Sequence, residues 1–335
     1  MRTLSRDSTI AGGEAADGAA ARAPAERRFA DQKDELLRGL LRARARIDPK
    51  FFYDAAGCEL FEAICRLPEY YLTRTEASIF ARHGEAIARA LPGGSQWVDL
   101  GCGDGAKSRE WLGRAGARRY LAVDIAGEAV AGAVRSARER FPGIECDGIA
   151  CDFSAHLDLH RRLAERPGAP PVLFYPGSSL GNFTGPRALA FLRTLRAHAG
   201  SGGSLLIGVD LVKDAAVLEA AYDDAAGVTA EFNRNVLRVA NRLLDADFDP
   251  QAFDHRAIYH RAHARIEMRL VSRLDQRVRI GELTRHFHPG EGILTEYSHK
   301  YTVEGFARML SRAGFSRQQA WTDAAGWFAV FHAQP

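Results

Sequence analysis

Residues 98–108 read VDLGCGDGAKS, and this stretch decides the fold. Three glycines follow a short apolar run, which is typical of the turn between a buried strand and a helix at a nucleotide site. The third glycine, Gly105, comes one position earlier than in GxGxxG, and Asp99 and Asp104 would repel a pyrophosphate. The turn therefore argues against a dinucleotide oxidoreductase and favours a positively charged ligand without phosphate.

Two later positions agree with such a ligand. Asp124 ends the next expected strand, where a carboxylate can accept hydrogen bonds from both ribose hydroxyls. Asp152 and Phe153 end the following strand, so the carboxylate can bind an adenine amino group while the ring covers the base. All of them fall at carboxyl ends of strands, where open α/β sheets bind ligands. S-adenosylmethionine fits, because it has a cationic sulfonium, an ammonium group and a ribose.

The surrounding pattern predicts a doubly wound α/β sheet. Apolar runs alternate with helix-like segments such as 127–141 and 186–198, which favours βαβ units and a parallel sheet covered on both faces. The apolar runs lie at 97–100, 120–123, 144–150, 172–175 and 205–209.

After residue 210 the rhythm changes. A long helical segment is predicted over 212–244, and a helix over 303–313 precedes two strands around an Ala-Ala-Gly turn. Alternating stretches between them predict antiparallel strands at 266–273, 276–280 and 282–288. We therefore expect a second module to interrupt the first sheet.

Composition excludes little. The 335 residues are 46% hydrophobic and 26% charged, and the net charge of +3 is too small to indicate a nucleic-acid or membrane surface. No apolar run approaches the roughly 20 residues that cross a bilayer. Five cysteines without a CxxC pair fit a reducing cytosol. Residues 1–28, rich in Ala, Gly and Arg, are predicted to be a disordered tail.

Two histidine pairs and a run of arginines have simple interpretations. Each pair lacks a third ligand at metal-site spacing, so exposed strand or loop faces are favoured. The pairs are His286 with His288 and His260 with His263. A helix is predicted over 29–46, with three arginines on its exposed side rather than in a nucleic-acid patch. They are Arg42, Arg44 and Arg46.

Longer blocks carry a more specific likeness. YPGSSLGNF (175–183) follows the fourth strand, where nucleic-acid amine methyltransferases usually have an Asn-Pro-Pro-aromatic turn. The other blocks are FFYDAAGCELFEAICRLPEYYLTRTEA (51–77), DLVKDAAVLEAAYDDAAGVTAEFNRNVL (210–237), ARIEMRL (264–270) and ILTEYSHKY (293–301). Together they resemble the histidine-specific, S-adenosylmethionine-dependent methyltransferases. That family converts L-histidine to its trimethylated betaine, hercynine, in ergothioneine biosynthesis.

The resemblance implies a fold, partners and site residues. It implies a class I methyltransferase domain, Rossmann-like and doubly wound, over 75–211 and 301–335, with an α+β substrate-binding domain over 29–74 and 212–300. Family positions around the methyl donor are occupied by Tyr53, Gly101, Lys107, Asp124, Asp152 and Phe153. Those around the amino acid are occupied by Tyr70, Gly177, Asn182, Tyr222, Met268, Glu296 and Ser298. We expect a cytoplasmic monomer without a metal, a nucleic acid or a membrane partner.

Residue chemistry supports histidine as the substrate. Asn182 and Tyr222 can hydrogen-bond its carboxylate without a basic residue. Glu296 and Ser298, two apart on an expected strand, face one side and can bind the two ring nitrogens. Met268 would shape an apolar wall.

The transfer itself needs alignment more than acid–base help, because the sulfonium is already a good leaving group. We expect the amine proton to leave to water, with Tyr70 the weaker candidate as acceptor. The carbonyl of Gly177 can orient the amine.

Two rival functions stay open. One is methylation of another aromatic amino acid, such as a tryptophan derivative, which Glu296 disfavours because a buried carboxylate beside an indole is poorly compensated. The other is a catalytically silent ligand-binding relative, which the intact donor and substrate residues disfavour.

Overall fold

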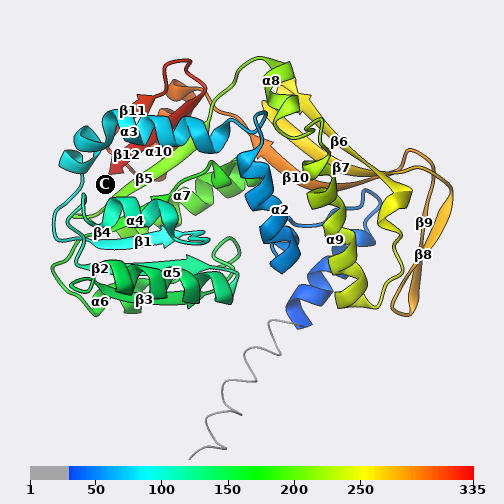
Figure 1. The fold of residues 1–335 in the computed structure, drawn as a ribbon, viewed down its shortest axis with the longest axis horizontal. Helices are drawn as coiled ribbons and strands as arrows, with labels where there is room; N and C mark the ends of the chain where they lie inside the picture. The colour runs from blue at the N-terminus through cyan, green and yellow to red at the C-terminus, as the bar shows by residue number, and fades with distance from the viewer. Residues whose placement is uncertain (1–29) are drawn as a thin grey trace, which may run out of the picture.

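The computed structural model describes residues 30–335, and two sheets dominate it (Figure 1). The larger sheet consists of β1 (Gln96–Leu100), β2 (Arg119–Asp124), β3 (Glu145–Ala150), β4 (Pro171–Tyr175), β5 (Ser204–Asp210), β11 (Arg317–Thr322) and β12 (Phe328–Gln334). Their order across the sheet is β11-β12-β5-β4-β1-β2-β3. The expectation for residues 1–28 lies outside the described residues.

Pairing within this sheet confirms the doubly wound α/β prediction. β1 lies between β2 and β4, and all neighbours from β3 to β5 are parallel. Only β12 runs antiparallel, between β5 and β11. Each of the five apolar runs forms a strand, and the ends of each strand lie within one or two residues of the predicted ends.

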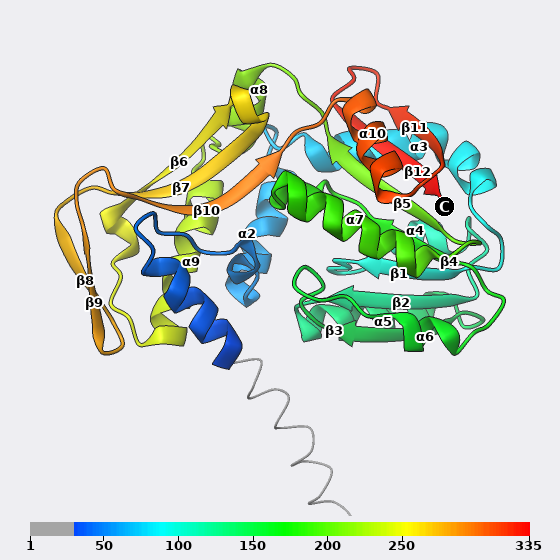
Figure 2. The ribbon, with the colours of Figure 1, turned by 180° about the vertical axis from the view of Figure 1, so that it is seen from behind.

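Helices cover both faces of this sheet (Figures 1 and 2). One face carries α3 (Leu72–Ala90), α4 (Ala106–Leu112) and α5 (Gly127–Arg140). The other face carries α7 (Gly185–Ala199) and α10 (Val303–Ala313). The short helix α6 (His160–Ala164) lies near the β3 edge. Successive strand residues alternate between the two layers, so Trp97 packs in one core and Val98 in the other. Both cores are closed to water, which explains the continuous apolar runs.

The second sheet is antiparallel and smaller. It contains β6 (Phe253–His260), β7 (Arg265–Ser272) and β10 (Gly292–His299), in the order β10-β7-β6. A hairpin of β8 (Gln276–Ile280) and β9 (Leu283–Phe287) extends from it. The helix α9 (Val228–Leu244) packs against β6 and β7, and α2 (Ala55–Arg66) packs against α9.

The chain leaves the large sheet and returns to it at one place. Leu211 and Tyr301 form a parallel bridge, and the amide of Val212 donates to the carbonyl of Tyr301 at 2.9 Å. We therefore retain these positions as proposed domain boundaries. No helix within residues 30–335 is long and apolar enough to span a membrane.

Three predictions about local structure were wrong. The first helix covers 30–40 and not 29–46, because the chain folds back on Gly39, whose carbonyl accepts from the amide of Arg46 at 3.0 Å. The three arginines therefore follow the helix in a loop. The segment 212–244 contains two helices, α8 (Ala215–Ala220) and α9. After α8 ends, left-handed Gly227 and the carboxylate of Asp224, which accepts from the first amides of α9, begin the second helix. β6 was missed, because its inward side includes His255 and an outward position is Ile258.

Candidate active site

The glycine turn exposes its backbone at the carboxyl end of β1. Gly101, Gly103 and Gly105 have φ of +75°, +51° and +71°, a region that favours glycine. A Cβ on Gly105 would lie 2.9 Å from the Cβ of Ala133, whereas one on Gly103 would meet no atom within 4 Å. The turn therefore packs tightly on its α5 side and stays open on its outer side.

Asp124 fixes this turn from the end of β2. Its Oδ2 accepts from the amide of Gly103 at 3.0 Å, and its Oδ1 accepts from the amide of Ala126 at 3.0 Å. Both oxygens keep lone pairs for further donors, such as ribose hydroxyls. Asp99 instead lies buried beside Tyr120, whose hydroxyl donates to it at 3.1 Å, and burial raises the pKa of Asp99 to about 6.

Asp152 has a partner that the sequence did not reveal. Its Oδ2 lies 2.8 Å from Nζ of Lys50, which also pairs with Glu35 at 2.6 Å. Burial acts to raise the pKa of Asp152, but the hydrogen bonds from Lys50 and Ser154 outweigh it and lower the pKa. The carboxylate is thus kept ionised by Lys50, which belongs to the short helix η1 (Pro49–Phe52).

The ring of Phe153 lies over the start of the glycine turn. Its edge is 3.7 Å from the position that a Cβ on Gly101 would take. It also packs edge-on against Tyr175 at the end of β4, with ring centroids 5.9 Å apart. Phe153 therefore stands where an aromatic face can meet a ligand bound on the turn.

Lys107 and Gly177 converge on one buried acid. Oε2 of Glu76 on α3 lies 2.5 Å from Nζ of Lys107, and its Oε1 accepts from the amide of Gly177 at 2.8 Å. Glycine at 208 makes room for this acid, because a Cβ there would lie 2.2 Å from Oε1 of Glu76. One of the predicted donor residues and one of the predicted substrate residues are thereby joined through Glu76, which sequence reasoning missed.

A chain of aromatic rings connects the same two groups of residues. Ring centroids lie 5.8 Å apart for Tyr53 and Phe61, 6.2 Å for Phe61 and Tyr70, and 6.3 Å for Tyr70 and Tyr222. Burial raises the pKa of Tyr53, and the carboxylates of Glu296 and Asp124 raise it further. The Tyr53 hydroxyl is therefore within electrostatic range of both predicted sites.

Glu296 is a nearly buried carboxyl group without a partner. It is 8% exposed, and no hydrogen bond or ion pair to its side chain occurs within residues 30–335. Burial raises its pKa to about 7, although the nearby Lys300 acts to lower it. A buried acceptor of this kind is costly unless a ligand satisfies it.

Ser298 belongs to a buried polar network. Its Oγ lies 2.8 Å from the Tyr222 hydroxyl. Nζ of Lys300 donates to the Ser298 hydroxyl at 2.8 Å and to the Tyr222 hydroxyl at 3.0 Å. Lys300 also pairs with Asp210 at 2.8 Å, and this carboxylate raises the pKa of the ammonium despite its burial. A basic residue thus lies beside Tyr222, and the expectation that the substrate carboxylate is bound without one stays a prediction.

Asn182 and Met268 approach the same strand. Asn182 ends η2 (Ser179–Asn182), which lies against β10 because Gly181 has no Cβ; one would come within 2.9 Å of the His299 carbonyl. The Asn182 side chain makes no hydrogen bond to any described residue. Met268 is buried and stands beside Glu296 in the β7–β10 register. All seven predicted substrate residues therefore lie around η2, the aromatic rings and the inner face of β10.

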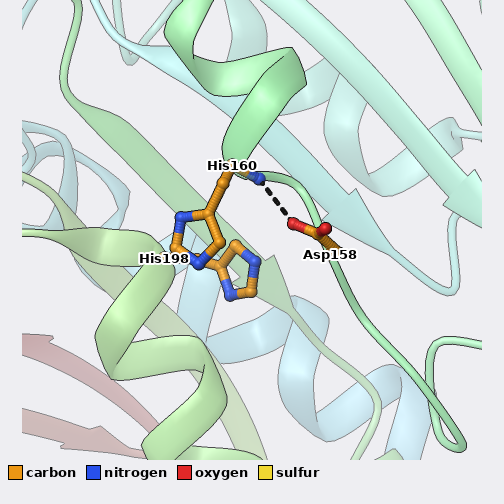
Figure 3. A group of neighbouring side chains, drawn as sticks. All are labelled: Asp158, His160 and His198. Carbon is orange, nitrogen blue, oxygen red and sulfur yellow. Dashed lines mark hydrogen bonds between the residues drawn. The ribbon is translucent and has the colours of Figure 1, made fainter.

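One side-chain group near α6 has the composition of a metal site but does not fit one (Figure 3). Nε2 of His198 accepts from the amide of Leu159 at 2.9 Å, and Nδ1 lies 2.8 Å from the carbonyl of Thr194. Asp158 accepts from the amide of His160, as the dashed line shows. Because both His198 nitrogens are occupied, this group is a hydrogen-bonded helix contact.

The expectation that the His286–His288 pair has no third group nearby was wrong. Asp275, from the loop before β8, lies 2.6 Å from Nε2 of His286 and 3.2 Å from Nδ1 of His288. All three side chains are exposed. Their mutual hydrogen bonds account for the arrangement, and the absence of a metal stays a prediction.

Comparison with known proteins gives a consistent result. The profile of a family described as histidine-specific, S-adenosylmethionine-dependent methyltransferase matches residues 32–335. Histidine N-alpha-methyltransferases of Mycolicibacterium smegmatis and Mycobacterium tuberculosis are each 42% identical, over 90% and 88% of this chain and 95% and 92% of their own lengths. Ergothioneine biosynthesis protein 1 of Neurospora crassa is 30% identical over 81% of this chain and 31% of its own length.

Proposed function

Since this chain belongs to the histidine-specific, S-adenosylmethionine-dependent methyltransferase family, we propose that it methylates the α-amino nitrogen of L-histidine three times and so makes hercynine for ergothioneine biosynthesis. The observation that carries the choice of histidine is the buried, unpartnered carboxyl group of Glu296 beside the Ser298 hydroxyl.

The donor residues fit S-adenosylmethionine. Asp124 has free lone pairs for the ribose hydroxyls, the open glycine turn can take the amino-acid part, and Phe153 can cover the adenine. Asp152 can accept from the adenine amino group in addition to Lys50, because each carboxylate oxygen takes more than one donor. When bound, the donor supplies an electrophilic methyl group on a cationic sulfur.

The substrate residues suit an imidazole. Glu296 accepts from the ring N–H. Lys300 has only donors, so the hydroxyls of Ser298 and Tyr222 accept from it. One of the two hydroxyls also donates to the other at 2.8 Å, which leaves one hydroxyl hydrogen for a ligand. With Tyr222 donating to Ser298, the Ser298 hydrogen can serve the second ring nitrogen and the free amide of Asn182 can serve the substrate carboxylate. Tyr222 joins Asn182 at the carboxylate when its hydrogen turns from Ser298 to the ligand.

The chain's main contribution to the reaction is alignment. Holding the amine lone pair in line with the methyl group supplies on the order of 7–11 kcal/mol. Burial raises the pKa of Tyr70 well above its usual range, with the neighbouring Tyr222 adding to the effect, which disfavours Tyr70 as the base. The amine proton leaves to water, and the carbonyl of Gly177 orients the nitrogen.

An indole substrate is disfavoured by the same groups. An indole has one ring N–H and no ring acceptor, so it would offer no acceptor to the Ser298 hydrogen. We further propose that the enzyme is a cytoplasmic monomer that needs no metal and binds neither nucleic acid nor membrane.

The test is a product assay. The purified protein is incubated with S-adenosylmethionine and each common amino acid in turn, with and without a metal chelator, and product mass is followed. Histidine alone should gain up to three methyl groups, and the chelator should have no effect. Methylation of tryptophan in preference to histidine would refute the substrate choice, and binding of S-adenosylhomocysteine without any methylation would support a silent relative.

A further inference from the structure

A cavity lies on the outer face of the small sheet, behind the strands that carry Met268 and Glu296. Its volume is about 560 Å³. The loop 41–47 forms one wall, because Ala45 and Ile47 pair with Leu294 of β10 through two backbone hydrogen bonds of 2.9 Å. Five arginines contribute to its lining: Arg42, Arg44, Arg46, Arg265 and Arg269.

Strand alternation separates this cavity from the proposed histidine site. On β7, Glu267 and its arginine neighbours point to the cavity, while Met268 points to the buried side. On β10, Tyr297 lines the cavity, while Glu296 and Ser298 are buried on the other side. The two sites therefore share strands but no side chains.

The positive charges in the cavity are only partly balanced. Glu267 pairs with Arg265 and Arg269, each at 2.6 Å. Glu291, the other acid in the lining, pairs at 2.6 Å with Arg285, which is not part of the lining. Within residues 30–335, none of the three loop arginines (Arg42, Arg44 and Arg46) has a carboxylate within 4.0 Å. The cavity thus has an excess of guanidinium groups.

Two of these groups lie against the same ring. The guanidinium of Arg265 lies 3.8 Å from the ring centre of Tyr297, and that of Arg46 lies 5.1 Å from it. Cation–π contacts offset part of the repulsion between like charges, and an anion bound in the cavity would offset more of it. Guanidinium forks match the oxygens of phosphate in geometry as well as in charge.

We propose that this cavity is a binding site for a small, multiply charged anion that carries phosphate groups. Its concave shape and volume suit a small molecule. A nucleic acid fits less well, because the net charge of the chain is only +3 and the arginines line a hollow rather than a track.

The test is calorimetry of the full chain with inorganic tripolyphosphate at low salt. The proposal predicts saturable one-to-one binding that weakens as salt rises. Citrate should bind at least tenfold more weakly, and equal binding of citrate would overturn the phosphate assignment. Adenosine triphosphate forms a further arm: tighter binding than tripolyphosphate would identify a nucleotide as the source of the phosphate groups, and equal binding would identify the phosphate chain itself.

Paired variants locate the site. Replacing two exposed cavity residues together, Arg42→Gln and Arg44→Gln, should weaken tripolyphosphate at least tenfold. The matched control, Arg193→Gln with Arg317→Gln, removes equal charge from exposed positions elsewhere and should keep the wild-type affinity. Binding of S-adenosylhomocysteine by both double variants would verify that they are folded. No saturable binding to the wild type, or equal loss in both double variants, would overturn the proposal.

Discussion

The two halves of the proposed active site are built in different ways. Apart from Tyr53, the donor half comes from one stretch between β1 and the residues just after β3, and it presents the glycine turn and the carboxylates of Asp124 and Asp152. The substrate half gathers side chains from five distant segments, and it depends on a buried network around Lys300. The glycine turn of the donor half forms from residues close together in the chain. The substrate half forms only after the small sheet has packed against the rest of the molecule.

This difference predicts separable defects. A change in the donor half should alter donor affinity and leave the histidine groups in place, and the reverse should hold for the substrate half. Glu76 and the aromatic rings from Tyr53 to Tyr222 connect the two halves. Only substitutions at these residues should change the affinities for the donor and for histidine together.

The largest effect is expected for Asp124→Ala. The variant loses the acceptor of the Gly103 amide and the proposed acceptor of the ribose hydroxyls, so S-adenosylhomocysteine affinity should fall by about 100-fold or more in calorimetry. Asp104→Ala is the matched control, because Asp104 lies in the same turn with a largely exposed side chain. An equal loss in both variants would mean that overall turn charge, and not Asp124, holds the donor.

Glu296→Gln should come next, with the loss confined to histidine. A charged hydrogen bond contributes roughly 1.5–3 kcal/mol, so KM for histidine should rise by about 30-fold at pH 8 while donor affinity stays unchanged. Glu304→Gln, an exposed acid at the start of α10, is the control. An unaltered KM would remove Glu296 from the site.

Asn182→Ala should have a smaller effect on the same ligand. Loss of a neutral amide that binds the substrate carboxylate should weaken histidine by about tenfold and the donor by less than threefold. Calorimetry with each ligand separates the two, and unchanged histidine affinity would refute the proposed role of Asn182.

The smallest effect concerns the ligand-free protein. The pKa of Glu296 is raised to about 7 in the folded state from 4.5, so the folded state binds more protons than the unfolded chain between these values. Its contribution therefore makes stability fall as pH rises from about 4.5 through 7, by roughly 2–3 kcal/mol in total. Glu296→Gln should remove this loss, raising Tm relative to the wild type at pH 8 but not at pH 4.5. A variant Tm at or below wild type at pH 8 would contradict the account.

The same contrast explains what could be predicted from the sequence. Strand ends, the left-handed glycines and Asp124 follow from residues close together in the chain, because apolar runs and turns are local signals. The bend after Gly39 and the polar strand β6 depend on pairing with other segments, such as that of Ala45 and Ile47 with Leu294. The start of α9 at Gly227 depends on the nearby Asp224, a local signal that the hydrophobic pattern did not reveal.

The missed site residues share a physical cause. Glu76, Lys50 and Lys300 look like ordinary charged residues until folding pairs them with partners. Lys50 and Asp152, for example, are 102 residues apart. The proposed imidazole partners rest on the family resemblance and on their two-residue spacing, since nothing local marks Glu296 as unpaired.

A double-mutant cycle between protein and ligand tests the central claim most directly. Histidine and thienylalanine, which has a similar five-membered ring without N–H groups, are titrated into wild type and Glu296→Gln in the presence of S-adenosylhomocysteine. The account predicts that the wild type strongly prefers histidine and that the variant loses most of this preference. If the preference for histidine is equally large in both proteins, Glu296 does not contact the imidazole and the account is wrong.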